Sequence, residues 1–136
     1  MNFSPYLSFK GNCREAFAFY TKTFNGKLIM QMTYGEAPTG QEMPGATRDQ
    51  IMHARIEING QHLMGSDAPG EHYKPSQGIQ VAVGVAEPAE AERIFKALSE
   101  GGSTYMPMQE TFWALRFGMC SDRFGVPWIV NCEKPR

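Results

Sequence analysis

The stretch IMHARIEINGQHLMGSD, residues 51–67, decides the fold because it holds two alternating strands joined by Asn59-Gly60. Asn-Gly is the strongest short signal for a two-residue hairpin, since both central residues of that turn adopt positive φ. Antiparallel partners move apart in step, so the turn predicts that Arg55 lies opposite Met64. The hairpin therefore predicts which side chains share a face of the sheet.

The two faces of this hairpin differ in character. One face is apolar and is expected to pack against helices; it carries Ala54, Ile56, Ile58 and Leu63. The other face is polar apart from one methionine and carries His53, Arg55, Glu57, His62, Met64 and Ser66. A face of this composition is a candidate site, but it is more often a solvated surface.

A helix is predicted before the hairpin, in NCREAFAFYTKTFNG, residues 12–26. Asn12 and Glu15 have the spacing of a capping box, in which each side chain bonds a free backbone N–H of the first turn. Asn25 and Gly26 are expected to end the helix, because glycine reaches the left-handed conformation without a Cβ clash.

A second helix of the same design is predicted after the hairpin, in EPAEAERIFKALSEGG, residues 87–102. Pro88 suits the first helical turn, and Gly101 is the stop signal. Gly101 lies 75 positions after Gly26 (101 minus 26), and the apolar positions of the two helices match at the same offset. The chain is therefore interpreted as an internal repeat.

The second copy ends like the first, with strands. WALRFGMCS, the sequence DRFG as a four-residue turn, and PWIVNC form a second hairpin over residues 113–132. This count predicts an apolar core face of Leu115, Phe117, Met119, Trp128 and Val130, and an opposite face of Arg116, Ile129 and Asn131.

The prediction for the whole chain is an α+β fold of two βαβββ modules. The first module spans residues 1–68, a linker spans 69–77, and the second module spans 78–136. EAPTGQEMPGATRD, residues 36–49, is expected to be a mobile loop. Two sheets with one polar face each could enclose a cleft.

Composition excludes several functional classes. The formal net charge is −1, from 13 basic and 14 acidic residues without a basic run, which argues against a nucleic-acid partner. The opening residues lack the pattern of a signal peptide, and no apolar run reaches the roughly 18 residues of a membrane span. We therefore expect a cytoplasmic protein with no membrane partner.

The cysteines do not indicate a disulfide framework or a structural zinc site. Cys13, Cys120 and Cys132 are odd in number and form no CxxC pair. They are expected to be reduced and to behave as small buried hydrophobes, although each could be a reactive thiol.

The segments SPYLSFKGNCREAFAFY, IMHARIEINGQHLMGSDAP and QETFWALRFGMCSDRFGVPWIVN resemble the vicinal oxygen chelate superfamily. This superfamily is also called the glyoxalase, bleomycin-resistance and dioxygenase family, and its unit is the paired βαβββ module. The chain is most similar to its PhnB-like branch, some of whose members are labelled 3-demethylubiquinone-9 3-methyltransferases. The resemblance implies a curved mixed or antiparallel sheet with helices on its outer face.

The resemblance also implies where a metal would bind. Metal-dependent members take ligands from the first and last strands of both modules, which correspond approximately to Pro5, Met64, Gln80 and Ile129. Only Gln80 offers an oxygen donor, so we expect a degenerate site without a metal or another cofactor. A methyltransferase activity is not expected, because no strand leads into a glycine-rich nucleotide-binding turn.

Two functions remain open. The first is binding of a small polar or anionic molecule in the cleft, with ten candidate contact residues: His53, Arg55, Glu57, Met64, Ser66, Gln80, Phe112, Trp113, Arg116 and Asn131. The second is a lyase, isomerase or dioxygenase with displaced metal ligands such as His53, His62 and Glu57, or with metal-free acid/base catalysis. The resemblance also implies a homodimer, and no catalytic residue is assigned.

Overall fold

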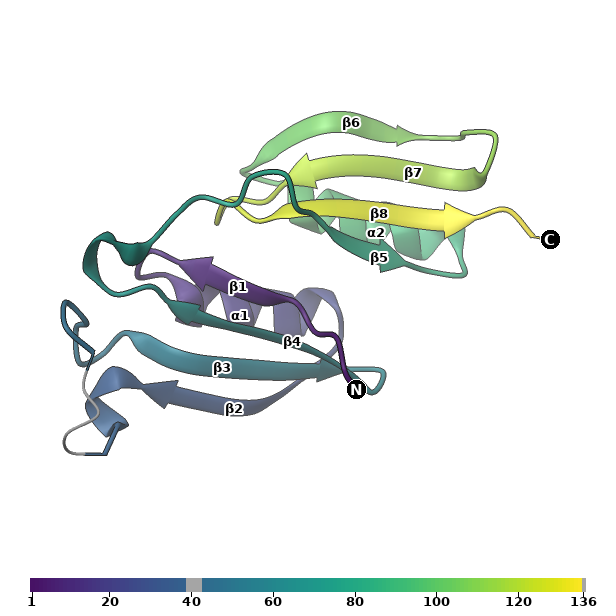
Figure 1. Ribbon diagram of the computed structural model, residues 1–136. Helices are drawn as coiled ribbons and strands as arrows, with labels where there is room; N and C mark the ends of the chain where they lie inside the picture. The colour runs from purple at the N-terminus through teal and green to yellow at the C-terminus, as the bar shows by residue number, and fades with distance from the viewer. Residues whose placement is uncertain (39–42, 136) are drawn as a thin grey trace. The chain divides into compact units, whose positions relative to one another are not determined.

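The computed structural model describes residues 1–38 and 43–135, which form two compact units, Met1–Pro75 and Ser76–Arg136 (Figure 1). The boundary between the units falls inside the predicted linker 69–77. Residues 39–42 of the predicted loop lie outside the described residues.

The first unit is a βαβββ module. Its elements are β1 (Tyr6–Phe9), α1 (Cys13–Thr23), β2 (Lys27–Thr33), η1 (Tyr34–Glu36), β3 (Ile51–Ile58), β4 (Gln61–Asp67) and η2 (Gly70–His72). The strand order is β1-β4-β3-β2, with β1 and β4 parallel and the other pairs antiparallel. The predicted hairpin register is confirmed, because Arg55 lies opposite Met64 and Ile58 opposite Gln61.

The second unit repeats this topology. Its elements are β5 (Val81–Gly84), α2 (Pro88–Ser99), β6 (Ser103–Gln109), β7 (Ala114–Ser121) and β8 (Pro127–Glu133). The strand order is β5-β8-β7-β6, again with one parallel pair, β5 and β8. The predicted α+β fold of two βαβββ modules is confirmed, and each sheet is a four-stranded mixed sheet with a helix on one face.

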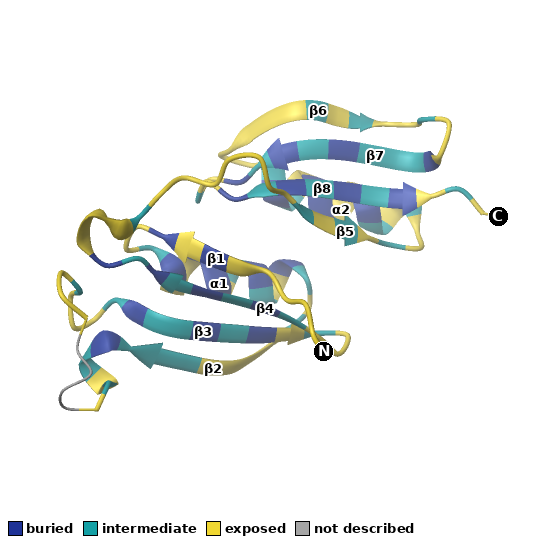
Figure 2. Ribbon diagram, in the orientation of Figure 1, coloured by how far each residue is buried: buried dark blue, intermediate teal, exposed yellow. Residues whose placement is uncertain are grey.

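Helix α1 packs on the first sheet through a close approach at Gly65. A Cβ at that position would lie 2.7 Å from the ring of Phe17 and 2.9 Å from the carbonyl oxygen of Leu7. Phe9, Phe17 and Tyr20 are fully buried beside it, with their rings 5.7 to 6.5 Å apart. The buried apolar core of this unit therefore lies between α1 and one face of the sheet (Figure 2).

The N-terminus of α1 is capped by Asp67 of β4, and not by the predicted capping box. Asn12 makes no side-chain cap hydrogen bond. Instead the buried Asp67 carboxylate accepts the N–H groups of Gly11 and Cys13 through Oδ1, and that of Ile51 through Oδ2, at 2.8 to 3.0 Å. A carboxylate is the stronger acceptor and carries the charge that a helix N-terminus favours.

The predicted end of α1 also shifts by one residue. Asn25 adopts the left-handed conformation, with φ of 54°, whereas Gly26 does not. Gly26 is needed for space instead, because a Cβ there would lie 2.9 Å from the carbonyl oxygen of Glu57. In the second helix Gly101 holds the expected left-handed position, with φ of 76°.

The faces predicted for β7 are wrong by one residue. DRFG is not a four-residue turn: Asp122 pairs with Val126, and the turn is Arg123–Gly125, with Gly125 at φ of 89°. Such three-residue turns place a glycine in the left-handed region. Cys120, not Met119, therefore lies opposite Trp128, and a slip of one residue turns every β7 side chain to the other face.

The second core forms on the corrected face of β7. Gly118 and Cys120 pair with Val130 and Trp128, and a Cβ at Gly118 would lie 2.7 Å from the ring of Phe95 on α2. The Trp128 indole donates its N–H to Asp122 Oδ2 at 2.8 Å, and both side chains are buried. The same carboxylate accepts the N–H groups of Phe124 and Val126, so it fixes the turn.

Cys13, Cys120 and Cys132 are buried free thiols, as expected. Burial, and secondarily the charge of Asp67, raises the pKa of the Cys13 thiol. Burial, with a smaller effect of Asp122, raises the pKa of Cys120 to about 11. Thiols held protonated in this way are poor nucleophiles, which argues against a reactive cysteine at either position.

In the described part of the chain, neither helix is long and apolar enough to cross a membrane.

Candidate functional site

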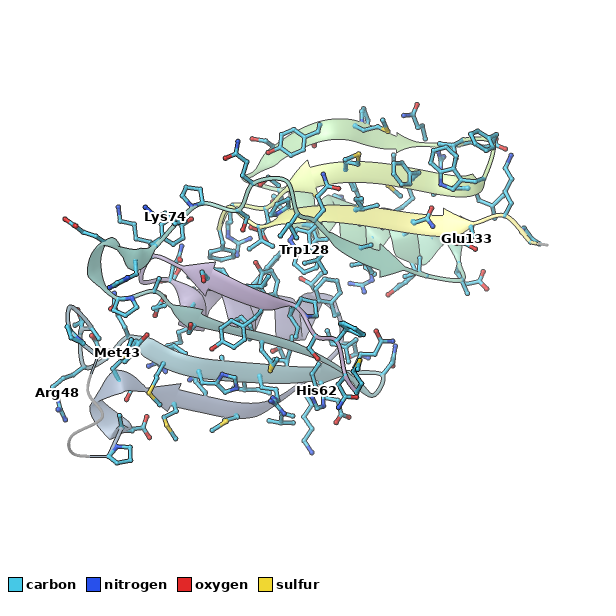
Figure 3. All side chains as sticks on the ribbon, viewed as in Figure 1. Met43, Arg48, His62, Lys74, Trp128 and Glu133 are labelled. Atoms are coloured by element: carbon cyan, nitrogen blue, oxygen red, sulfur yellow. The ribbon has the colours of Figure 1, made fainter. Side chains whose placement is uncertain are left out.

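Each sheet has one face without a helix, and these faces carry most of the candidate residues. In the first unit, Ala54 pairs with Gly65 on the α1 side, so the alternate residues of β3 point away from α1. We call this surface the first open face; it consists of Tyr6, Met30, Met32, His53, Arg55, Glu57, His62, Met64 and Ser66. His62 marks its end at the hairpin turn (Figure 3).

Arg55 lies at the centre of the first open face, between Met30 on β2 and Met64 on β4. Its Nη2 donates to the Met64 Sδ at 3.2 Å, and a thioether is a weak acceptor. Its Nε is buried and has no hydrogen-bond partner. Among the described residues, no ion pair includes Arg55, so the guanidinium has no carboxylate to neutralise it.

His53 lies two residues from Arg55 and contacts Tyr6 from β1. The two rings stack with centroids 5.7 Å apart, and the Tyr6 hydroxyl lies 3.1 Å from His53 Nδ1. Burial, and secondarily the positive charge of Arg55, lowers the pKa of His53 below its ordinary value of 6.5. A neutral imidazole with its proton on Nε2 can accept a hydrogen bond from the Tyr6 hydroxyl at Nδ1.

Glu57 and His62 lie at the hairpin end of the first open face. Their Oε2 and Nε2 atoms are 3.8 Å apart, and the Glu57 side chain is 48% exposed. Lys27 on β2 lies opposite Glu57. The Glu57 carboxylate is therefore directed to these neighbours and to solvent, and forms no ion pair with Arg55.

The second unit has an equivalent surface, the second open face, which consists of Ala82, Gly84, Met106, Phe117, Met119, Ile129 and Asn131. Asn131 is its main polar group, and its Oδ1 is buried without a hydrogen-bond partner. Phe117 lies opposite Asn131, and the Trp113 ring stands edge-on to the Phe117 ring at 5.2 Å.

Arg116 does not belong to the second open face, contrary to the prediction. It lies opposite Cys132, and its Nε is 2.9 Å from Glu92 Oε1 on α2. An anionic partner for Arg116 is therefore supplied within the chain, on the helix side of the sheet. The cause is the miscounted turn, which exchanged Arg116 and Phe117 between faces.

Two other candidates lie at the margins of the second unit. Gln80 is exposed and precedes β5, whereas it was expected to lie on the strand itself. Phe112 is 89% exposed and stacks edge-on against Trp113, with centroids 4.8 Å apart, in the turn between β6 and β7.

The positions implied for a metal offer few donors. The Pro5 carbonyl oxygen accepts the Met64 N–H, the Met64 sulfur accepts from Arg55, and Ile129 lies between Met119 and Ala82. Among the described residues, no three side chains of His, Cys, Asp or Glu converge. These residues do not fit the ligand set of a divalent metal centre.

Tyr6, Gly84 and Phe117 are among the residues of these faces that were not predicted. Tyr6 reaches His53 through the β1–β4 pairing, which is parallel and joins distant segments, so no local pattern indicates it. Phe117 was assigned to the core by the turn count. The Asn59-Gly60 hairpin, in contrast, correctly placed His53, Arg55, Glu57, Met64 and Ser66.

Comparison with known proteins agrees with this architecture. Residues 1–131 match the family described as 3-demethylubiquinone-9 3-methyltransferase. The chain is 36% identical to protein YjdN of Escherichia coli (strain K12), over 98% of this chain and 97% of that protein.

Solved structures extend the likeness to three dimensions. The crystal structure of protein PA1353 from Pseudomonas aeruginosa is 44% identical, with a TM-score of 0.89 and 99% of both chains covered. The PhnB protein from Bacillus cereus shares the fold at 24% identity and a TM-score of 0.81, over 97% of this chain and 99% of that one.

The fold reaches beyond these relatives. The glyoxylase/bleomycin resistance protein/dioxygenase domain from Frankia sp. EAN1pec has a TM-score of 0.63 at 13% identity, over 98% of this chain and 95% of that one. The chain belongs to the 3-demethylubiquinone-9 3-methyltransferase family, and it shares its fold with the PhnB protein and with the glyoxylase/bleomycin resistance protein/dioxygenase domain.

Proposed function

We propose that the protein binds a small anionic molecule on its first open face, with Arg55 as the anchor for a carboxylate or phosphate group. The observation that carries the proposal is the buried Arg55 Nε, which has no hydrogen-bond partner among the described residues, on a guanidinium that donates to the Met64 thioether.

The unsatisfied Arg55 guanidinium lowers the stability of the ligand-free protein. A buried donor without an acceptor costs about 1 to 3 kcal/mol, and a charged one costs more. Arginine presents its N–H groups in a planar fork that matches a carboxylate or phosphate. An anion at this position accepts a hydrogen bond from the open Nε and neutralises the charge. Ligand binding therefore removes the free-energy cost of the buried unpaired donor.

The neighbours of Arg55 suit the rest of such a ligand. His53 and Tyr6 offer polar atoms beside the guanidinium, while Met30, Met32 and Met64 provide apolar contact. Methionine side chains adapt to irregular ligand shapes because they are unbranched and polarisable. The ligand expected here carries an anionic group next to an apolar body.

We propose further that the metal site of the superfamily is degenerate in this chain. Proline, methionine and isoleucine at three of the four expected positions supply neither charge nor imidazole. The alternative with His53, His62 and Glu57 as displaced ligands is disfavoured, because these side chains do not form a three-donor group.

A second candidate is a metal-free acid/base enzyme with His53 as the base. One observation favours it, the lowered pKa of His53. Burial keeps the imidazole neutral, so the ring is able to accept a proton. Glu57, the carboxylate that could act as a second acid/base group on this face, is exposed and lies beside His62. Ligand binding therefore remains the preferred function.

The methyltransferase activity in the family description is not part of this proposal. Adenosylmethionine-type nucleotides commonly bind where a parallel strand leads into a glycine-rich turn and a helix. Here β1 leads into α1 through KGN and β5 into α2 through VAE, neither of which is glycine-rich. A thermal-shift titration with S-adenosylmethionine is expected to leave the melting temperature unchanged; a saturable increase would support the methyltransferase description.

The proposed function is tested by titrating the full chain with benzoate, monitored by heteronuclear NMR. The Arg55→Met variant retains a straight apolar side chain and loses the charge, so benzoate affinity should fall about tenfold or more. Arg14→Met, on the exposed surface of α1, is the matched control and should bind like the wild type. Equal affinities for Arg55→Met and the wild type would refute the proposal.

Two expectations about context also remain proposals. The chain is expected to form a homodimer and to be located in the cytoplasm. Cell fractionation tests the location, and sedimentation equilibrium tests the dimer.

A further inference from the structure

The second open face contains a polar atom that the proposed function does not use. Asn131 Oδ1 is buried and accepts no hydrogen bond, although the main-chain carbonyl of the same residue accepts the Val85 N–H at 2.9 Å. The side-chain amide therefore presents an acceptor that the described residues leave unsatisfied. Such a group is costly to keep unless a partner arrives from outside.

Gly84 provides open space directly beside this acceptor. It lies next to Asn131 in the parallel β5–β8 pairing, so both residues face the same side of the sheet. A Cβ built at Gly84 would meet no atom within 4 Å. Glycine in a strand commonly marks a place where a ligand approaches the backbone closely.

An aromatic wall stands on the other side of Asn131. Phe117 lies opposite it on β7, and the Trp113 ring meets the Phe117 ring edge-on, with an angle of 74° between their planes. Trp113 is 42% exposed, so its indole is accessible. The acceptor thus has a flat glycine floor on one side and an aromatic side chain on the other.

We propose that this surface is a second binding site, which takes a planar aromatic molecule whose N–H donates to Asn131 Oδ1. The flat ring lies over Gly84 and contacts Phe117. The site goes beyond the proposed function, because it lies entirely within the second unit and involves neither Arg55 nor an anion.

Indole and benzofuran are the probes that test the site, because they share one shape and only indole has the N–H donor. Saturation-transfer NMR on the full chain is expected to give indole about tenfold higher affinity than benzofuran. In Asn131→Leu this preference should disappear. Arg55→Met should keep the preference, which separates this site from the anion site.

Gly84→Val tests the floor of the site. The new side chain meets no neighbour and suits a strand, so the fold is expected to persist while both probes are excluded. The control is Thr104→Val, which places the same valine side chain on the α2 side of the same sheet, opposite Cys120, with little change in volume. Equal affinity of the two probes for the wild type, no binding of indole, or unchanged indole binding by Gly84→Val would each overturn the proposal.

Discussion

At the scale of single residues, Asp67 joins three separate segments of the first unit. Its carboxylate accepts N–H groups from the start of α1 and from the first residue of β3, and its side chain is buried. Asp122 has a comparable role in the second unit, where it holds the β7–β8 turn and the Trp128 indole. Each unit thus depends on one buried acceptor.

Removal of the Asp67 carboxylate should be strongly destabilising. Asp67→Ala leaves the Gly11, Cys13 and Ile51 N–H groups without their acceptor, and we expect a loss of roughly 3 kcal/mol or more in the free energy of unfolding. Chemical denaturation measures this loss. The exposed Asp49→Ala is the control and should cost less than about 0.5 kcal/mol. Similar values for the two variants would show that the Asp67 hydrogen bonds contribute little.

The titration of His53 gives a second residue-scale prediction. Because its pKa is lowered in the folded protein, the unfolded chain binds a proton more readily as the pH falls below 6.5. Folding stability should therefore decrease with falling pH from that point down to the folded-state pKa. In His53→Gln this part of the pH dependence should be absent.

The imidazole signals of His53 provide the direct measurement. Their NMR titration midpoint should lie below 6.5 in the wild type, and Arg55→Met should move it upward, because that variant removes the repulsive charge. A midpoint at or above 6.5 in the wild type would contradict the described environment of the ring.

At the scale of elements, the contact between α1 and its sheet depends on Gly65. Gly65→Ala pushes a methyl group against the Phe17 ring and the Leu7 carbonyl oxygen, and should cost about 1 to 3 kcal/mol. Gly84→Ala is the matched control, since it meets no atom within 4 Å and should be neutral or slightly stabilising. The comparison of their thermal unfolding checks the prediction, which fails if Gly65→Ala is equally harmless.

The two hairpins show how much of each element could be predicted from sequence. Asn59-Gly60 permits one common turn, so the register of β3 and β4, and with it Arg55 on the open face, followed from the sequence. DRFG fits a three-residue turn as well as a four-residue one, and only the left-handed Gly125 distinguishes them. Arg116 was misplaced for this reason, and Tyr6 was missed because its partner lies on a distant strand.

At the scale of the whole molecule, the internal repeat explains why the fold was predictable before its sites were. The two helices carry apolar residues at matching positions, so each was expected to pack on a sheet of the same kind. Both units indeed form βαβββ modules with one open face. The functional residues do not repeat. The first open face has the charged Arg55 at its centre, whereas the second is apolar around the single amide of Asn131, so the two faces suit different ligands.

The expected homodimer is also a property of the whole molecule. Modules of this size bury a limited core, and an edge strand of the first unit exposes Leu28, Ile29 and Met30 by 42 to 44%. Sedimentation equilibrium at micromolar concentration should give about twice the chain mass of 15.2 kDa. A mass of one chain under these conditions would rule the dimer out.

We propose that an anion binds at the open Nε of Arg55. The most direct test follows the Arg55 Nε–H signal by NMR while benzoate is added to the wild-type protein at constant ionic strength. We expect a saturable downfield shift as this buried donor gains a charged acceptor, with no such shift for the exposed Arg14. An Arg55 signal that stays in place, or that moves equally when chloride replaces benzoate, would contradict it.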